Sequence, residues 1–250
     1  MAPAIVTLLT DFGTADGYVA EMKGVLLTGV RDATVVDITH DVAPQDVDGA
    51  RLALARYWRR FPEGTIHMVV VDPGVGSDRP ALAVQCERRF LVGPGNGVLS
   101  PALVAPGARV VRLPVPPSAA PTFHGRDVFA PAAVRLASGE TVDALGEAEH
   151  DPVIRRTPEP RRAADGTMEG VVVTIDRFGN AITNLLGVRG GMVRIGPNTV
   201  AVRRTYSDAA PGEAVAVVGS SGWLEVAVRD GNAARVLQLA RGMAVRLHPR

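Results

Sequence analysis

The feature that most limits how this chain can fold is a change of pattern at a proline-containing segment, residues 153–166. Before this segment, short apolar runs alternate with stretches in which apolar residues recur at helical spacing. After it, short apolar runs are separated by glycine-rich turns. We therefore predict an N-terminal domain over residues 1–152, a linker over residues 153–166 and a C-terminal domain over residues 167–250.

The N-terminal domain is predicted to be an α/β domain with a mainly parallel sheet. Its expected elements are strands at residues 4–9, 34–38, 65–71, 81–86 and 89–92, and helices near residues 18–26 and 47–61. This alternation of strands and helices is typical of a parallel sheet that helices cover. Residues 105–122 carry five prolines and are predicted to form an irregular connection.

The C-terminal domain is predicted to be a small all-β barrel. Its expected strands are residues 170–175, 192–195, 200–203, 214–218, 223–228 and 244–247. Short strands at this spacing, with glycine-rich turns between them, favour a small antiparallel sheet or barrel.

Composition excludes several classes of function. Lys plus Arg number 27 and Asp plus Glu number 26, so the net charge of +1 gives no reason to expect a nucleic-acid or membrane partner. The single cysteine, Cys86, excludes an internal disulfide and a CxxC metal site. No apolar run approaches the roughly 18 residues of a membrane-spanning helix, and the histidines lack ligand spacing. We expect a cytoplasmic protein without a metal site.

Two aspartates follow predicted strands of the N-terminal sheet. Asp11 follows the first strand, and Asp72 follows strand 65–71 in a turn with two glycines. Ligands of open α/β sheets bind at the carboxyl ends of the strands, so both carboxylates are expected at one crevice. The two oxygens of Asp11 suit a ribose diol, but Asp11 could equally cap the next helix. Arg79 is near enough in sequence to pair with Asp72, and a purely structural ion pair is the simpler interpretation.

Further polar groups lie in predicted loops. His124 precedes an apolar helical pattern, where a capping or surface role is the simpler interpretation. The candidates in the C-terminal domain are Asp176, Phe178, Asn180 and the loops at residues 219–222 and 230–232. Such loops can recognise amino-acid and base edges through hydrogen bonds, but any small barrel also needs them.

Taken in order, the motifs of this chain resemble those of one family. They are TDFG at 10–13, DITHDVAPQDV at 37–47, VVVDPGVGS at 69–77, GPGNGVLS at 93–100, FHGRDVFAP at 123–131, IDRFGNAITN at 175–184 and GSSGWLEVAV at 219–228. The family is the S-adenosylmethionine hydroxide adenosyltransferases, which share a fold with fluorinating and chlorinating enzymes acting on the same substrate. The resemblance extends over nearly the whole chain.

The resemblance implies an N-terminal α/β domain, a linker and a C-terminal β-barrel. It implies a homotrimer that holds the substrate between the N-terminal domain of one subunit and the C-terminal domain of its neighbour. It also implies hydrolysis of S-adenosylmethionine to adenosine and methionine without a cofactor. Asp72, Arg79 and His124 would then be the catalytic residues that hold the attacking water.

The resemblance also implies a set of substrate contacts in both domains. They are Asp11 and Gln45 at the ribose, Asp16 and Asp176 at the methionine ammonium group, Ser220 at the carboxylate, Phe178 and Asn180 beside the adenosine, Tyr206 on the adenine, and Phe123, Ser221, Glu225 and Asn232 elsewhere in the site.

Three positions differ from the halogenating relatives. Gln45 stands where the fluorinating enzyme has a tryptophan, and Asp72 and Val75 stand where its halide pocket has a tyrosine and a threonine. An anionic Asp72 would repel a halide, so water is the expected nucleophile. The alternatives are a halogenase and a non-catalytic sensor of S-adenosylmethionine or adenosine. Whether Asp72, His124 or a hydroxide stabilised by Arg79 handles the proton stays open.

Overall fold

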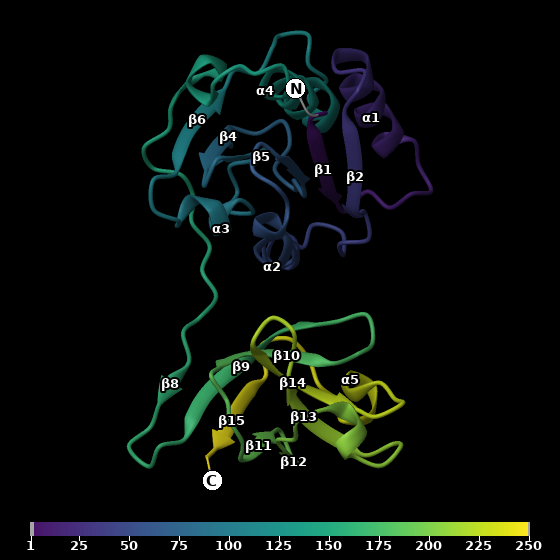
Figure 1. Ribbon diagram of the computed structural model, residues 1–250, viewed down its shortest axis with the longest axis vertical. Coiled ribbons are helices and arrows are strands. Elements are labelled where there is room, and N and C mark those ends of the chain that lie inside the picture. Colours follow the sequence, from purple (N-terminus) through teal and green to yellow (C-terminus); the bar gives the residue numbers. More distant parts are fainter. Residues whose placement is uncertain (1–2, 250) are drawn as a thin grey trace. The chain divides into compact units, whose positions relative to one another are not determined.

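The computed structural model describes residues 3–249 and divides them after Arg155 into an N-terminal and a C-terminal domain (Figure 1). The structure contains two large β-sheets. One lies wholly in the N-terminal domain and the other lies wholly in the C-terminal domain.

The N-terminal domain is built on a seven-stranded sheet with the order β2-β1-β3-β5-β4-β6-β7. Its strands are β1 (Ile5–Thr10), β2 (Thr34–Thr39), β3 (Ile66–Val70), β4 (Ala81–Cys86), β5 (Arg89–Pro94), β6 (Arg109–Leu113) and β7 (Glu147–Ala148). β1 lies between β2 and β3, and Thr10 pairs with Val70. The loops that follow β1 and β3 therefore begin side by side at the carboxyl ends of these two parallel strands.

The sheet is mixed, so the prediction of a mainly parallel sheet is wrong for the half that follows β5. The pairs β1–β2, β1–β3 and β3–β5 are parallel, whereas β4, β6 and β7 join by antiparallel pairing. The reason is local. Only Glu87 and Arg88 connect β4 to β5, both with positive φ (47° and 56°), and so short a turn can join only antiparallel strands.

Helices cover both faces of this sheet. They are α1 (Tyr18–Gly29) and α4 (Ala130–Ala137) on one face, and α2 (Val47–Tyr57) and α3 (Ser100–Leu103) on the other (Figure 1). Neighbouring strand residues alternate between the two cores: Leu8 packs with α1 and α4, and Leu9 packs with α2. Strands covered on both faces are mostly apolar, which is why their apolar residues form nearly continuous runs in the sequence.

Shorter turns of helix complete the N-terminal domain. They are the 3₁₀ helices Trp58–Arg60 and Val142–Leu145 and a π-helical turn at Gly125–Phe129 that leads into α4. The proline-rich segment 105–122 is not irregular throughout, because it contains β6. The prolines of that segment lie on either side of β6, where they leave its hydrogen bonds to β4 intact.

The C-terminal domain is a nearly closed, antiparallel, barrel-like sheet. Its path is β12-β11-β15-β9-β10-β14-β13, with β8 paired to β9. The strands are β8 (Arg161–Arg162), β9 (Met168–Ile175), β10 (Ala181–Leu186), β11 (Met192–Ile195), β12 (Asn198–Ala201), β13 (Ala214–Val218), β14 (Trp223–Val228) and β15 (Ala244–His248). Between the two ends of this path, a single bridge joins Val202 to Ala216. Short helical turns at Tyr206–Asp208 and Ala233–Val236 (α5) lie in its loops.

Three details of the C-terminal domain differ from the sequence prediction. β10 was not predicted, because residues 181–185 are buried on both faces of the strand and show no clean alternation. The strand predicted at 200–203 lies two residues earlier, because residues 196–197 form the turn that follows β11. β8 lies within the segment predicted to be a linker and belongs to the C-terminal sheet.

Two further observations bear on location and redox chemistry. Across residues 3–249, no helix is long and apolar enough to cross a membrane. Cys86 is a buried free thiol at the end of β4.

Candidate active site

Asp72, Arg79 and His124 meet at the end of β3. The Arg79 Nε donates to Asp72 Oδ1 at 2.8 Å, and its Nη2 donates to Asp72 Oδ2. The same Nη2 lies 2.9 Å from His124 Nδ1. Only 5% of the Asp72 side chain and 10% of the Arg79 side chain are exposed. The three side chains therefore form one connected group with little access to water.

The contact with Arg79 fixes the protonation of His124. A guanidinium can only donate, so His124 Nδ1 must be the acceptor and the hydrogen of a neutral imidazole sits on Nε2. Burial of the ring, followed by the charge of Arg79, lowers the pKa of His124. His124 is thus a neutral hydrogen-bond donor through Nε2, and it is buried rather than on the surface.

Glycines allow the loop after β3 to adopt this arrangement. Gly76 has a φ of 78°, and a Cβ at this position would lie 2.6 Å from the carbonyl oxygen of Pro121, just before His124. The DPGVG turn can therefore pack against the segment that carries His124 only because this residue has no side chain.

Asp11 lies beside this group at the end of the neighbouring strand β1. Its Oδ2 accepts a hydrogen bond from the Gln45 main-chain nitrogen at 2.7 Å. Gln45 has a φ of 67°, a conformation that L-residues rarely adopt. The structure thus brings Asp11 and Gln45 together, while Asp16 is exposed in the loop before α1.

Aromatic rings pack next to His124. Phe123 is buried, and its ring centroid lies 5.9 Å from that of Phe12 and 5.4 Å from that of Tyr18. Phe12 directly follows Asp11, so this cluster connects the loop after β1 to the segment with His124.

In the C-terminal domain, Asp176 organises the turn between β9 and β10. Its Oδ1 accepts from the main-chain nitrogens of Phe178 (2.9 Å) and Asn180 (2.8 Å), and its Oδ2 accepts from the Asn180 side chain (3.2 Å). A Cβ at Gly179 would overlap the side chain of Asn232, so this turn and the loop after β14 lie in close contact.

These loops line a cavity of about 670 Å³. Its lining includes Phe178, Asn180, Tyr206 and Asn232, four of the residues predicted from the sequence. Phe178 is 75% exposed and Tyr206 is 43% exposed, which is unusual for large aromatic side chains. Two exposed rings beside polar loops suit a flat, hydrogen-bonding ligand such as a purine.

Glu225, on β14, is buried and contacts Tyr206, a lining residue of this cavity. The Tyr206 hydroxyl donates to its carboxylate. Burial of the hydroxyl and the hydrogen bond to Glu225 both raise the pKa of Tyr206, so it stays a donor. A Cβ at Gly219 would lie 2.5 Å from Glu225 Oε2, so Glu225 also reaches the β13–β14 turn.

Ser220 and Ser221 are exposed at the tip of the β13–β14 hairpin and do not line the cavity. In the part of the chain that the structure describes, no three His, Cys, Asp or Glu side chains are grouped so that they could hold a metal ion.

Comparison with known proteins matches both domains to one family. Residues 6–146 match the SAM hydroxide adenosyltransferase N-terminal domain, and residues 170–246 match its C-terminal domain. The chain belongs to the SAM hydroxide adenosyltransferase family. A relative in this family, the (R)-S-adenosyl-L-methionine hydrolase of Thermus thermophilus, is 45% identical over 97% of this chain and 98% of its own length.

More distant relatives and solved structures agree with this assignment. The fluorinase of Nocardia brasiliensis is 29% identical over 97% of this chain and 96% of its own. An uncharacterized conserved protein from Thermotoga maritima superposes with a TM-score of 0.89 at 31% identity, covering 98% of this chain and 100% of that one.

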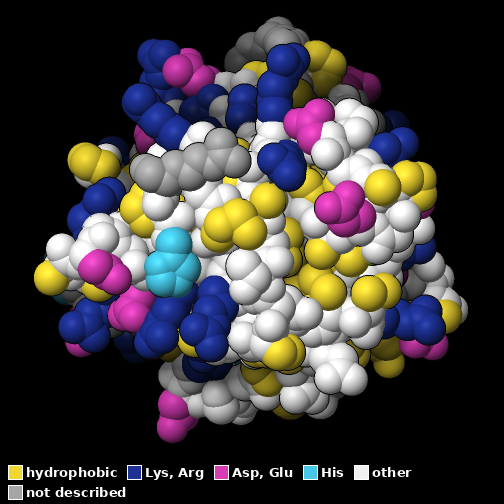
Figure 2. Space-filling view, turned by 90° about the horizontal axis from the view of Figure 1, so that it is seen from below, with side chains coloured by type: hydrophobic (Ala, Val, Ile, Leu, Met, Phe, Trp, Pro, Cys, Tyr) yellow, Lys and Arg dark blue, Asp and Glu magenta, His cyan; other side chains and the backbone are white. Residues whose placement is uncertain are grey.

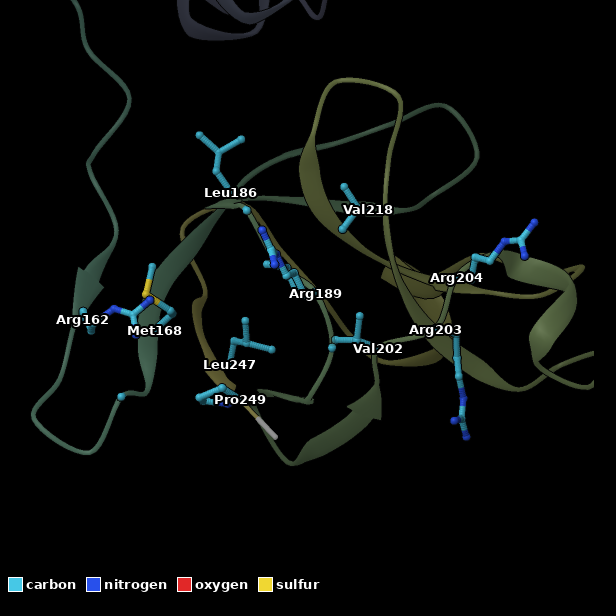
Figure 3. Close-up of a pocket in the computed structure, with 14 residues that line it drawn as sticks. Arg162, Met168, Leu186, Arg189, Val202, Arg203, Arg204, Val218, Leu247 and Pro249 are labelled. Atoms are coloured by element: carbon cyan, nitrogen blue, oxygen red, sulfur yellow. The ribbon is translucent and has the colours of Figure 1, made fainter.

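A second cavity, of about 750 Å³, lies in the C-terminal domain (Figure 3). Its charged lining residues are all arginines: Arg162, Arg189, Arg203 and Arg204. Figure 3 shows that Arg203 and Arg204 extend away from the apolar side chains. Figure 2 looks onto the C-terminal domain and shows hydrophobic side chains near the centre of this face with basic ones around them. Arginines would repel a sulfonium cation, so we do not assign this cavity to the SAM hydroxide adenosyltransferase site.

Several residues beside the candidate site were not predicted from the sequence. Phe12 and Tyr18 were not singled out, although Phe12 lies inside the TDFG motif. Thr10 and His40 also contact each other next to Asp11, although their positions are 30 residues apart. Only the pairing of β1 with β2 brings them together.

Proposed function

We propose that this protein hydrolyses S-adenosyl-L-methionine to adenosine and L-methionine by attack of water at C5′. The observation that carries the proposal is the buried group of Asp72, Arg79 and His124 at the end of β3. It supplies an anion, a cation and a neutral hydrogen-bond donor in one place. A site for a halide would not present a carboxylate to the nucleophile.

The chemistry needs alignment and one proton acceptor. The water oxygen forms a bond to C5′ while the bond from C5′ to sulfur breaks. The electron pair of the broken bond stays on sulfur. The cationic sulfonium therefore leaves as a neutral thioether and needs no general acid, metal or cofactor. Alignment of the reacting atoms can lower the barrier by about 7–11 kcal/mol in favourable cases.

The hydrogen bonds within this group support one assignment of roles to the three residues. His124 Nδ1 is occupied by Arg79, so His124 can orient the nucleophile only by donating from Nε2. Asp72 is then the member of the group that accepts the proton from water. Arg79 engages both oxygens of Asp72 and so holds the carboxylate in place.

We propose that the remaining predicted residues bind the substrate. Asp11 and Gln45 would hold the ribose. The cavity of about 670 Å³ in the C-terminal domain would take the adenine between Phe178 and Tyr206. The other proposed contacts are Asp16, Asp176, Ser220 and Ser221 for methionine, and Phe123, Asn180, Glu225 and Asn232 for the nucleoside. Carboxylates of both domains would thus face the ammonium and sulfonium charges.

We further propose that the two half-sites are completed in a homotrimer. The ribose and water groups belong to the N-terminal domain, whereas the adenine and methionine groups belong to the C-terminal domain. A neighbouring subunit would supply the second half. We propose no nucleic-acid or membrane partner, because the net charge of +1 gives neither a basis.

The test is incubation with S-adenosylmethionine in oxygen-18 water, with and without chloride, followed by mass spectrometry of the nucleoside. We expect adenosine with the label at the 5′ oxygen and no 5′-chloro product. A chlorinated nucleoside would identify a halogenase, and tight binding without turnover would identify a sensor. Adenosine without the label would exclude direct attack by water. Asp72→Ala, which removes the proposed acceptor, serves as the inactive control.

A further inference from the structure

A series of polar side chains in close contact supports the loop that carries Asp11. Thr10 is fully buried and His40 is 6% exposed, and Thr10 Oγ1 lies 2.8 Å from His40 Nδ1. On the other side of the ring, His40 Nε2 lies 3.1 Å from Asp37 Oδ1. Asp37 Oδ2 in turn accepts from Lys23 Nζ at 2.6 Å. These contacts thus follow one another from Lys23 to Thr10, the residue that precedes Asp11.

The hydrogen atoms in this series of contacts have one consistent arrangement. The Phe12 main-chain nitrogen donates to Thr10 Oγ1 at 3.3 Å, which leaves the Thr10 hydroxyl hydrogen free to be donated to His40 Nδ1. With Nδ1 as the acceptor, the ring hydrogen lies on Nε2, which is 3.1 Å from Asp37 Oδ1. Among residues 3–249 this nitrogen has no hydrogen-bond partner, so it is the bond to Thr10 that ties the His40 ring to the Asp11 loop.

The main chain of the same loop is held as well. The Gly13 nitrogen donates to the His40 carbonyl oxygen at 2.8 Å, and Asp11 Oδ2 accepts from the Gln45 nitrogen at 2.7 Å. Residues before and after Asp11 are therefore tied to the segment after β2. Within residues 3–249, no hydrogen bond from the protein reaches Asp11 Oδ1. That oxygen is the one left for a ligand.

We propose that His40 is a positioning residue for ribose recognition, acting through Thr10 on Asp11. The inference rests on the proposed function, because it takes the ribose diol as the partner of Asp11. His40 does not touch the ligand. It fixes where the Asp11 carboxylate stands, and a diol rewards that placement because two hydroxyls must meet fixed acceptors.

The chain offers a matched control on the same strand. Thr7 Oγ1 lies 2.8 Å from His67 Nδ1, a buried pair of the same kind between β1 and a neighbouring strand. Thr7 is about 10 Å further from Asp11 along β1. Thr7→Val and Thr10→Val therefore remove the same hydroxyl from the same type of bond, and only the second lies next to Asp11.

The experiment measures the affinity of the full-length protein for adenosine and for 2′,3′-dideoxyadenosine by calorimetry. The ratio of the two dissociation constants reports recognition of the diol and is insensitive to a general loss of stability. We expect wild-type protein and Thr7→Val to favour adenosine about 10- to 100-fold. We expect Thr10→Val and His40→Phe to lose most of this preference, and Thr10→Ser, which keeps the hydroxyl, to retain it.

Action through Asp11 makes one further demand. Adding Thr10→Val to Asp11→Ala should not lower the adenosine preference below that of Asp11→Ala alone. The inference is overturned if Thr10→Val and His40→Phe melt at lower temperature but keep the wild-type preference. If His40→Phe does not fold, the Thr10 variants decide the matter. A wild-type protein that binds adenosine without preferring it over the dideoxy compound refutes the ribose assignment itself, which is a different result.

Discussion

His67 should make the N-terminal domain lose stability as the pH falls below about 6.5. The side chain is fully buried on β3, with its Nδ1 2.8 Å from Thr7 Oγ1 and its ring among those of Tyr57 and Phe61. Burial, followed by the charge of Arg89, lowers the pKa of His67 to about 4. The folded domain therefore holds this imidazole neutral.

The size of the effect follows from proton linkage. An unfolded histidine has a pKa near 6.5, so below that value the unfolded chain binds a proton that the folded domain refuses. The contribution of His67 is fully present above pH 6.5 and is lost as the pH falls towards about 4. The loss amounts to about 2 kcal/mol at pH 5 and about 3 kcal/mol at pH 4.

The assay is urea denaturation between pH 7.5 and pH 4 of wild type and His67→Phe, both in a Trp223→Phe background. Trp58, fully buried in the same domain, then reports its unfolding by fluorescence. His67→Phe keeps an aromatic ring but removes the proton site, and its loss of the Thr7 hydrogen bond does not depend on pH. The variant should start less stable and decline less steeply. His150→Gln removes an exposed histidine and is the control.

Parallel curves for wild type and His67→Phe would refute this reasoning. Such a result would mean that the folded domain binds a proton at His67 as readily as the unfolded chain does. A variant curve that falls more steeply than that of the wild type would contradict even the sign of the proposed effect.

Three further predictions concern the site and the fold. Asp72→Asn should slow the single-turnover rate about 10²- to 10⁴-fold with little change in substrate affinity. Combining it with His124→Gln should reduce the rate far less than the product of the two single losses. Near-normal turnover in folded Asp72→Asn would contradict this. Mixing Asp11→Ala with Ser220→Ala subunits should restore part of the activity, and no recovery after verified exchange would argue against shared sites. Gly146→Ala should lower the free energy of unfolding by about 1–3 kcal/mol in urea titrations, because its Cβ would overlap a main-chain carbonyl. An unchanged midpoint would show instead that the main chain relaxes at this position.

Local pattern was sufficient for much of the fold. The apolar runs of β1 and β3 identify buried strands whose carboxyl ends carry Asp11 and Asp72, because the point where an apolar run ends is visible in the sequence itself. The sequence pattern did not predict whether neighbouring strands pair parallel or antiparallel. β4 and β5 were both recognised, yet the two residues between them make the pair antiparallel.

The candidate site divides in the same way. Motif order along the chain was sufficient to identify the family and to select Asp72, Arg79 and His124, since residue type and spacing are properties of the sequence. The protonation of His124 and the support of Asp11 by His40 were decided only by the tertiary structure. Both depend on hydrogen bonds between residues 30 or more positions apart, and the register of neighbouring strands and the packing of loops set such bonds. No local pattern in the sequence records them.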